Sequence, residues 1–198
     1  GGVVHPGLAD DLAGQQCFRT ENDCIGGAAS AEDQDGHGTH VAGMITGPEG
    51  VAPDARFYAL KVFTTGDTSD TNILNALDHV IDLNTNAPGT IDIINMSLGG
   101  DNFADQATCD ANGAGYVAAF STLVGQGVTI FVATGNDAQI DVVGSPSCIT
   151  GAVGVGSTGD AVITNNFSSC TDNAEPDKVS CFSNATPVQG AGELVRST

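Results

Sequence analysis

The apolar positions from residue 37 onward follow two periods, and each period predicts one kind of element. A helical spacing, with apolar residues at i, i+1, i+4, i+7 and i+8, occurs twice. It predicts helices over 73–81 and 116–124, the second ended by Gly125 and Gly127. Between the helices, short apolar runs rich in β-branched residues predict strands. These expected strands are 55–63, 91–97, 128–133 and 152–155.

Alternation of strands with helices predicts an α/β fold of parallel βαβ units with right-handed crossovers. We expect three layers, α/β/α, with a mainly parallel sheet. Residues 1–198 are expected to form a single domain, because a chain of this length can bury one substantial core. Residues 1–34 are rich in Gly, Asp, Ala and Ser and are expected to be loop.

Glycines on both sides of His37 leave little side-chain bulk around its imidazole, so we expect this histidine to be exposed. The apolar run that follows predicts a short buried helix that begins near His37. Histidine is the commonest general base or acid, although an isolated one is more often a structural or solvated group. A zinc site is disfavoured because His37 and His40 are spaced i,i+3 with no glutamate between them.

Two glycine-containing segments, 97–100 and 134–136, each follow an expected strand. The carboxyl ends of parallel strands form one rim of a sheet, where sites are commonly found. The glycines either end the strands or leave backbone that an extended peptide can approach. Asn136, after Gly135, is typical of a turn, and its amide is also free to donate a hydrogen bond.

The formal charge of −19 and the hydropathy pattern restrict the partners. Nucleic acids and anionic membranes are bound through Lys and Arg, and the chain has only 5 of these residues against 24 acidic ones. No run of about 18 apolar residues is present, so no membrane span is expected. We therefore expect neither a nucleic acid nor a membrane as partner.

The 6 cysteines fall in three sequence neighbourhoods and include no C-x-x-C motif. The absence of that motif removes the strongest zinc and redox signals, and disulfides in an oxidising compartment are the favoured interpretation. Sequence alone does not select one pairing. We favour pairing within each neighbourhood, which joins Cys17 to Cys24, Cys109 to Cys148 and Cys170 to Cys181.

Four motifs, in order, resemble the subtilisin-like serine protease family. The stretch from Asp35 to Gly47 contains H-G-T-H-V-A-G, which in that family carries the catalytic histidine as its first residue. Residues 50–55 resemble G-V-A-P-x-A, 95–100 resemble N-x-S-L-G-G, and 132–136 resemble A-A-G-N. The resemblance covers most of the chain from residue 35 to about 156. It is similar to the central part of the family's catalytic domain.

The resemblance implies a secreted endopeptidase that hydrolyses polypeptides through an acyl-enzyme. His37 matches the catalytic histidine and Asn136 the side-chain donor of the oxyanion hole. The family's substrate-pairing edge matches Ser97, Leu98 and Gly99, and the far wall of its specificity pocket matches Ala133, Thr134 and Gly135. No cofactor is required for this chemistry. Calcium often binds family members, but no ligand pattern assigns a metal site here.

Two motifs of the family are missing from these residues. The family's D-[ST]-G motif, with the catalytic aspartate, comes before an H-P-x-L segment that His5-Pro6-Gly7-Leu8 resembles, and its serine lies in G-T-S-M-A. Asp10 and Asp11 do not match the aspartate and are expected to be solvated charges in a loop or at a helix start. We expect the fold to be incomplete at both ends and the 198 residues alone to be inactive. A non-catalytic binding or assembly module is the alternative, and a second chain that supplies the missing elements is a third possibility.

Overall fold

The computed structural model describes residues 5–20, 22–159, 163–166, 170–174, 178–184 and 189–191. Contacts divide the chain into two compact units, and the boundary between His79 and Val80 falls inside helix α2 (Asp70–Asn86). Each unit has a parallel sheet and a buried core of its own. A single domain over residues 1–198 therefore stays a prediction.

The first unit is built on two parallel strands, β1 (Leu12–Cys17) and β2 (Phe57–Lys61), with Gln15 opposite Ala59. Before them comes the short helix η1 (Pro6–Leu8), and between them α1 (His37–Thr46). Residues 1–34 are therefore not all loop, and that expectation is wrong for β1. Its Gly-Gln-Gln segment has weak strand propensity, and the strand exists because it pairs with the strongly apolar β2.

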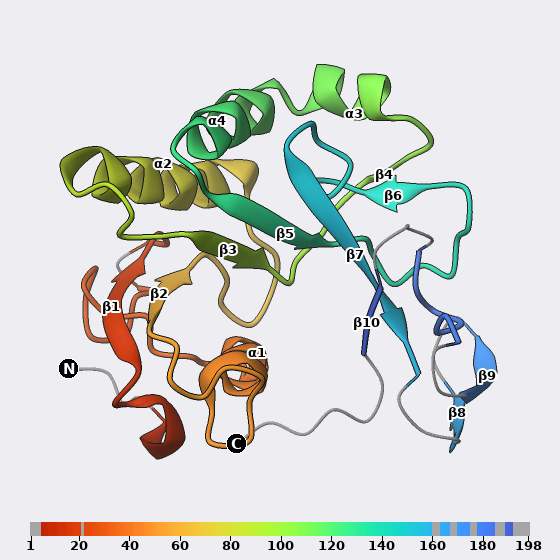
Figure 1. Ribbon diagram of the computed structural model, residues 1–198, viewed down its shortest axis with the longest axis horizontal. Coiled ribbons are helices and arrows are strands. Elements are labelled where there is room, and N and C mark those ends of the chain that lie inside the picture. Colours follow the sequence, from red (N-terminus) through yellow and green to blue (C-terminus); the bar gives the residue numbers. More distant parts are fainter. Residues whose placement is uncertain are drawn as a thin grey trace. The chain divides into compact units, whose positions relative to one another are not determined.

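The second unit contains a four-stranded parallel sheet in the order β10-β7-β5-β3 (Figure 1). Its strands are β3 (Ile93–Met96), β5 (Thr129–Ala133), β7 (Ala152–Thr158) and β10 (Gln189–Ala191). Helix α4 (Ala114–Gly125) connects β3 to β5 and lies on one face of the sheet. The expected parallel α/β arrangement is confirmed, as are the helices and strands read from the apolar periods.

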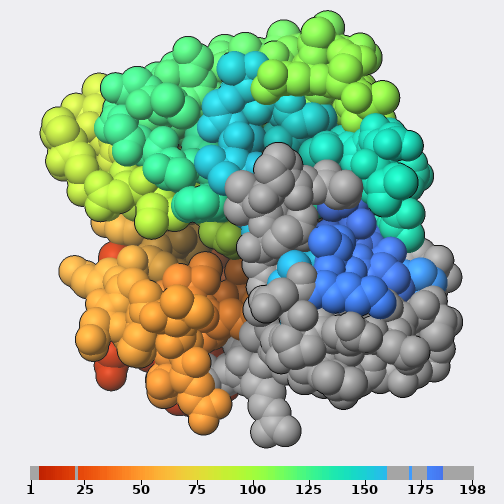
Figure 2. Space-filling model, turned by 45° about the vertical axis from the view of Figure 1, so that its right-hand side comes forward, coloured from red at the N-terminus to blue at the C-terminus, as the bar shows by residue number. Residues whose placement is uncertain are grey.

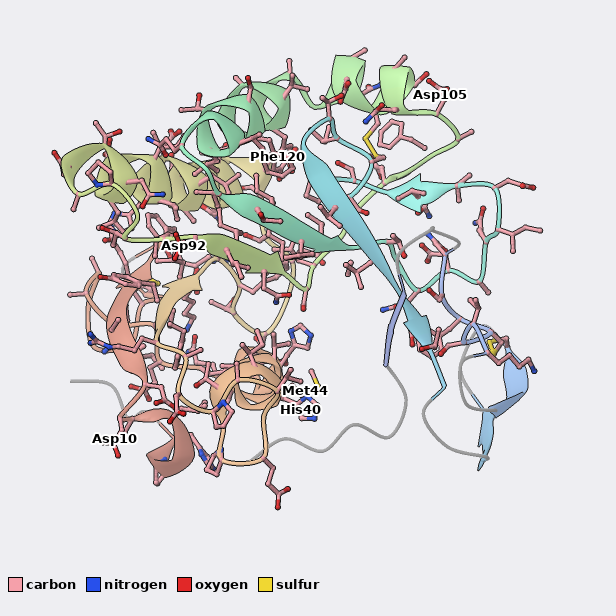
Figure 3. The ribbon with its side chains drawn as sticks, viewed as in Figure 1. Asp10, His40, Met44, Asp92, Asp105 and Phe120 are labelled. Atoms are coloured by element: carbon pink, nitrogen blue, oxygen red, sulfur yellow. A yellow bond between two sulfur atoms is a disulfide. The ribbon has the colours of Figure 1, made fainter. Side chains whose placement is uncertain are left out.

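The core of the second unit joins α4 to the centre of the sheet. Phe120, which Figure 3 labels, and Leu123 are fully buried, and so are Ile130 and Val132 of β5 according to their exposed fractions of 0–1%. Burial of each such side chain contributes about 1.5–3 kcal/mol. Gln126, at the end of α4, donates hydrogen bonds to the carbonyl oxygen of Ile81 and to Oγ1 of Thr85 in α2.

The remaining elements are short, and no apolar period predicts them. β4 (Asn102–Phe103) pairs with β6 (Val143–Gly144) and β8 (Ile163–Asn166) with β9 (Thr171–Ala174), both antiparallel. Helix α3 (Gln106–Asn112) is capped by the Asp105 carboxylate, which accepts from the Thr108 N–H. The disulfides Cys17–Cys24, Cys109–Cys148 and Cys170–Cys181 confirm pairing within neighbourhoods. Among the described helices, none has the length and apolarity needed to cross a membrane.

Candidate active site

His37 is the first residue of α1, and its side chain is exposed. The chain enters the helix through Gly36, whose φ of 96° is a conformation that glycine adopts without strain. No described residue forms a hydrogen bond with the imidazole. α1 and the segment after it, orange in Figure 2, form part of the surface. The expectation of a buried helix is wrong in part, because Ile45 is 38% exposed and only Gly43 and Thr46 are buried.

Asp33 holds the first turn of α1 in place. Its carboxylate accepts hydrogen bonds from the N–H groups of Asp35 and Gly36, both at 2.9 Å, and from the N–H and hydroxyl of Thr39, both at 2.8 Å. Partial burial alone would raise the pKa of Asp33, but the hydrogen bonds outweigh it and lower the pKa to about 2. Sequence reasoning missed this residue, because the N-cap position is Gly36 and Asp33 reaches the helix start from three residues before it.

Replacement of Asp33 by alanine is expected to destabilise the start of α1 by about 1 kcal/mol, because several N–H groups lose their acceptor. The carboxylate's contribution is present above its unfolded pKa of about 4 and is lost as the pH falls through about 2. Urea titrations between these pH values should therefore show the difference from wild type shrinking as the pH falls. Asp35→Ala is the control, because no described residue donates a hydrogen bond to the exposed Asp35 carboxylate; an equal loss there would contradict the role of Asp33 at the helix start.

Two other polar residues, His40 and Asp11, lie on or near α1. His40 is exposed and projects from α1 beside Met44 (Figure 3). Within the described part of the chain, no three His, Cys, Asp or Glu side chains lie close enough together to hold a metal ion. Asp11 accepts a hydrogen bond from the buried hydroxyl of Thr46 at 3.0 Å, so the expectation that it is merely solvated is wrong.

The second unit brings the two glycine-containing segments to one rim. β3 and β5 are neighbouring parallel strands, with Met96 opposite Val132, so the residues that follow them leave the sheet at the same edge. Ser97 and Gly99 are exposed and Leu98 is half-buried. Beyond them, the Gly100 N–H donates to the carbonyl oxygen of Ser145 at 2.8 Å. The common rim expected from the sequence is thus present.

Asn136 lies on this rim in the loop after β5, and its side chain is exposed. No hydrogen bond joins its carboxamide to another described residue. The half-buried Ala133 and Gly135 precede it, and Gly135 has a φ of 110°. Thr134 differs from its neighbours, because its side chain is 1% exposed and its hydroxyl donates to the carbonyl oxygen of Asn184. Thr134 therefore presents no side chain to a ligand.

Gly135→Ala is expected to destabilise the second unit by at least about 1 kcal/mol, since its positive φ strains any other residue. Packing adds to this strain, because a Cβ at position 135 would lie 2.6 Å from Nδ2 of Asn184. Urea unfolding of the two proteins measures the loss. Gly125→Ala is the matched control, because nothing lies within 4 Å of its Cβ position; unchanged stability of Gly135→Ala would contradict the packing account.

The described residues thus include an exposed histidine at the start of α1 and an exposed asparagine in the loop after β5. The sequence profile described as the subtilase family matches residues 3–194. The chain belongs to the subtilase family. In this subtilase the histidine of H-G-T-H-V-A-G lies in the first unit and the asparagine of the A-A-G-N-like motif in the second.

Named proteins similar to this subtilase are proteases. It is 32% identical over 154 residues to the minor extracellular protease Epr of Bacillus subtilis (strain 168), an alignment that covers 74% of this chain and 22% of Epr. It is 36% identical over 138 residues to the extracellular serine proteinase of Thermus sp. (strain Rt41A), which covers 69% of this chain and 30% of that protein. The chain thus spans a third or less of the length of these relatives.

Solved structures show the same fold. The structure of a cold adapted subtilisin-like serine proteinase matches this subtilase with a TM-score of 0.70 at 25% identity. The match covers 99% of this chain and 62% of that one. The α/β fold with mainly parallel sheets is therefore subtilisin-like, as the sequence predicts.

Sequence reasoning assigned no role to Asn184, which lies against the loop after β5. The F-S-N run at 182–184, which resembles a motif of the family, was the available signal for this residue.

Proposed function

We propose that this chain is part of a secreted subtilisin-like serine endopeptidase and supplies its general base and its oxyanion donor. The observation that carries the proposal is His37, exposed and without a hydrogen-bond partner among the described residues, at the position of the subtilase family's histidine. The serine nucleophile and the aspartate that orients the imidazole are assigned to residues outside these 198. The absence of D-[ST]-G and G-T-S-M-A from these residues supports this assignment.

The proposed reaction begins when His37 removes the proton from the serine hydroxyl as that oxygen attacks the substrate carbonyl. Negative charge then develops on the carbonyl oxygen, and the Asn136 carboxamide donates a hydrogen bond to it. The protonated His37 next gives its proton to the departing amine, which leaves an acyl-enzyme. Water then attacks the ester with His37 again as base, and the serine oxygen leaves with the proton that His37 returns to it. Every reacting group is a side chain, the substrate or water, and the proposed chemistry therefore requires no cofactor.

Polypeptide is the proposed substrate, and the rim of the second unit supports this. After β3, Ser97 and Gly99 are exposed and Leu98 is half-buried, and we assign this segment to main-chain pairing with an extended peptide, which gives affinity with broad sequence tolerance. Ala133 and Gly135 are proposed for the far wall of the specificity pocket. Thr134 contributes only its backbone to that wall, because its side chain is buried. The acidic charge of −19 disfavours nucleic acid as a partner.

Secretion is supported by two observations. Three disulfides are typical of an oxidising compartment, and two relatives are named as extracellular proteases. Structural calcium stays part of the proposal without an assigned site. A non-catalytic module on the same scaffold is the alternative function, and the missing nucleophile is the feature that favours it.

A fluorophosphonate probe separates these functions because it reacts only with an activated serine. The protein that contains this chain together with its flanking sequence, here called the flanked protein, is expected to be labelled and to hydrolyse casein. The 198 residues alone are expected to show neither reaction, because a base without a nucleophile forms no acyl-enzyme. A flanked protein that binds peptides but is never labelled would contradict the proposal and establish the binding module.

A further inference from the structure

Asn184 packs against the loop that carries Asn136, and 0% of its surface is exposed. Its Oδ1 accepts hydrogen bonds from the N–H groups of Asp137 and Gln139, both at 3.2 Å. Its Nδ2 donates to the carbonyl oxygen of Thr134 at 3.1 Å. The Asn184 carboxamide therefore binds the backbone of the loop both before and after Asn136.

The backbone of Asn184 adds two more bonds to the same loop. Its N–H donates to the carbonyl oxygen of Gly135 at 3.1 Å, and its carbonyl oxygen accepts from the Thr134 hydroxyl at 3.1 Å. Such close approach depends on Gly135, because any Cβ there would lie 2.6 Å from Nδ2 of Asn184. The two segments, about fifty residues apart in sequence, thus form one hydrogen-bonded layer.

A second asparagine extends this layer. Nδ2 of Asn184 also donates to Oδ1 of Asn102 at 3.0 Å, and Nδ2 of Asn102 donates to the Asp137 carboxylate at 2.8 Å. Both hydrogens of the Asn184 amide and both lone pairs of its oxygen are then used. A buried amide with every site satisfied holds its partners in one arrangement, because any shift leaves a polar group unpaired.

We infer that Asn184 is a positioning residue for the oxyanion donor Asn136, an inference that rests on the proposed function. An oxyanion donor lowers the barrier only if it is already in place when charge develops. No described residue holds the Asn136 side chain itself, so its position is set by the backbone of residues 134–139. Asn184 fixes that backbone and acts through Asn136 without contact with the substrate.

Asn84 offers a matched control in the same unit. It is 3% exposed, its Nδ2 donates to the carbonyl oxygen of Ile91 at 2.8 Å, and its Oδ1 accepts from the Ile91 N–H at 2.8 Å. It therefore secures a loop as Asn184 does. That loop, however, precedes β3, at the end of the strand opposite to the rim.

The test measures kcat and KM of the protein with its flanking sequence, per active site titrated with a fluorophosphonate. Asn184→Ala is expected to lower kcat about tenfold or more and to change KM less than about threefold, because a displaced donor weakens only the transition state. Asn84→Ala is expected to lower Tm and leave kcat unchanged. An unchanged kcat per titrated site in Asn184→Ala would overturn the inference.

The double variant Asn136→Ala/Asn184→Ala isolates the positioning role. The kcat of the double variant should be less than about threefold lower than that of Asn136→Ala alone, because the two residues act as one unit. Losses that multiply would overturn the inference. If Asn184→Ala does not fold, Asn102→Ala is the milder variant, and its smaller loss of kcat should also vanish in the Asn136→Ala background.

Hydrogen exchange at the amides of Asp137 and Gln139 gives a readout that does not depend on activity. Both should exchange faster in Asn184→Ala, since Oδ1 is their acceptor. If Asn136→Ala leaves kcat unchanged, the proposed function is wrong. If Asn136→Ala lowers kcat while Asn184→Ala changes neither kcat nor exchange, only the inference about Asn184 is wrong.

Discussion

Alanine in place of His37 is expected to lower peptide hydrolysis at least about 10²–10⁴-fold, which is the usual contribution of a general acid and base. The imidazole is exposed at the first position of α1, where it matches the catalytic histidine of the subtilase family, and no other described residue is proposed as the base. The measurement is kcat/KM of the flanked protein on a chromogenic peptide, together with the rate of fluorophosphonate labelling. Both should fall together, because both need an activated serine.

His40→Ala is the control for this prediction. His40 is exposed on the same helix, three residues further on, and no function is assigned to it. Its loss should leave kcat/KM within about twofold, because surface substitutions rarely have larger effects. Equal losses for His37→Ala and His40→Ala would show damage to α1 and would contradict the role of His37 as base.

Asn136→Ala is expected to lower kcat with little change in KM. In subtilisin, the enzyme in which this cost was established, loss of the oxyanion donor lowers kcat about 10²–10³-fold, and that value is taken over from it. The split between kcat and KM follows from chemistry, because the donor is needed only when the carbonyl oxygen becomes charged. Steady-state kinetics per titrated active site measure both constants.

Gln139→Ala is the matched control for Asn136→Ala. Gln139 is exposed in the same loop, and only its backbone N–H bonds to Asn184. Its side chain should be dispensable for kcat. A rise in KM with unchanged kcat in Asn136→Ala would place Asn136 in substrate binding and contradict its role as oxyanion donor.

The helices and strands that could be predicted are those that the burial of apolar side chains stabilises. The helical spacing over 116–124 became α4, because Phe120 and Leu123 cover the sheet. β1 could not be predicted, because its Gly-Gln-Gln segment carries little hydrophobic signal and owes its conformation to pairing with β2. Gly14 even serves that pairing, since a Cβ there would lie 2.6 Å from the Tyr58 ring.

Sequence could likewise propose some residues of the candidate site and not others. His37 and Asn136 belong to continuous motifs, so sequence could propose them, and the structure places both at the surface. Asn184 acts on residues more than forty positions away, and its burial and bonding exist only in the folded chain. Asp33 was missed because its acceptor role depends on a turn through Gly36 that no apolar period reveals.

The most direct test of the central claim is a crystal structure of the flanked protein after reaction with a fluorophosphonate. The account predicts a phosphonylated serine with the His37 imidazole within hydrogen-bond distance of the modified oxygen. It also predicts that the phosphonyl oxygen accepts a hydrogen bond from Nδ2 of Asn136. An adduct on a serine far from His37, or a phosphonyl oxygen held by other donors, would contradict the account.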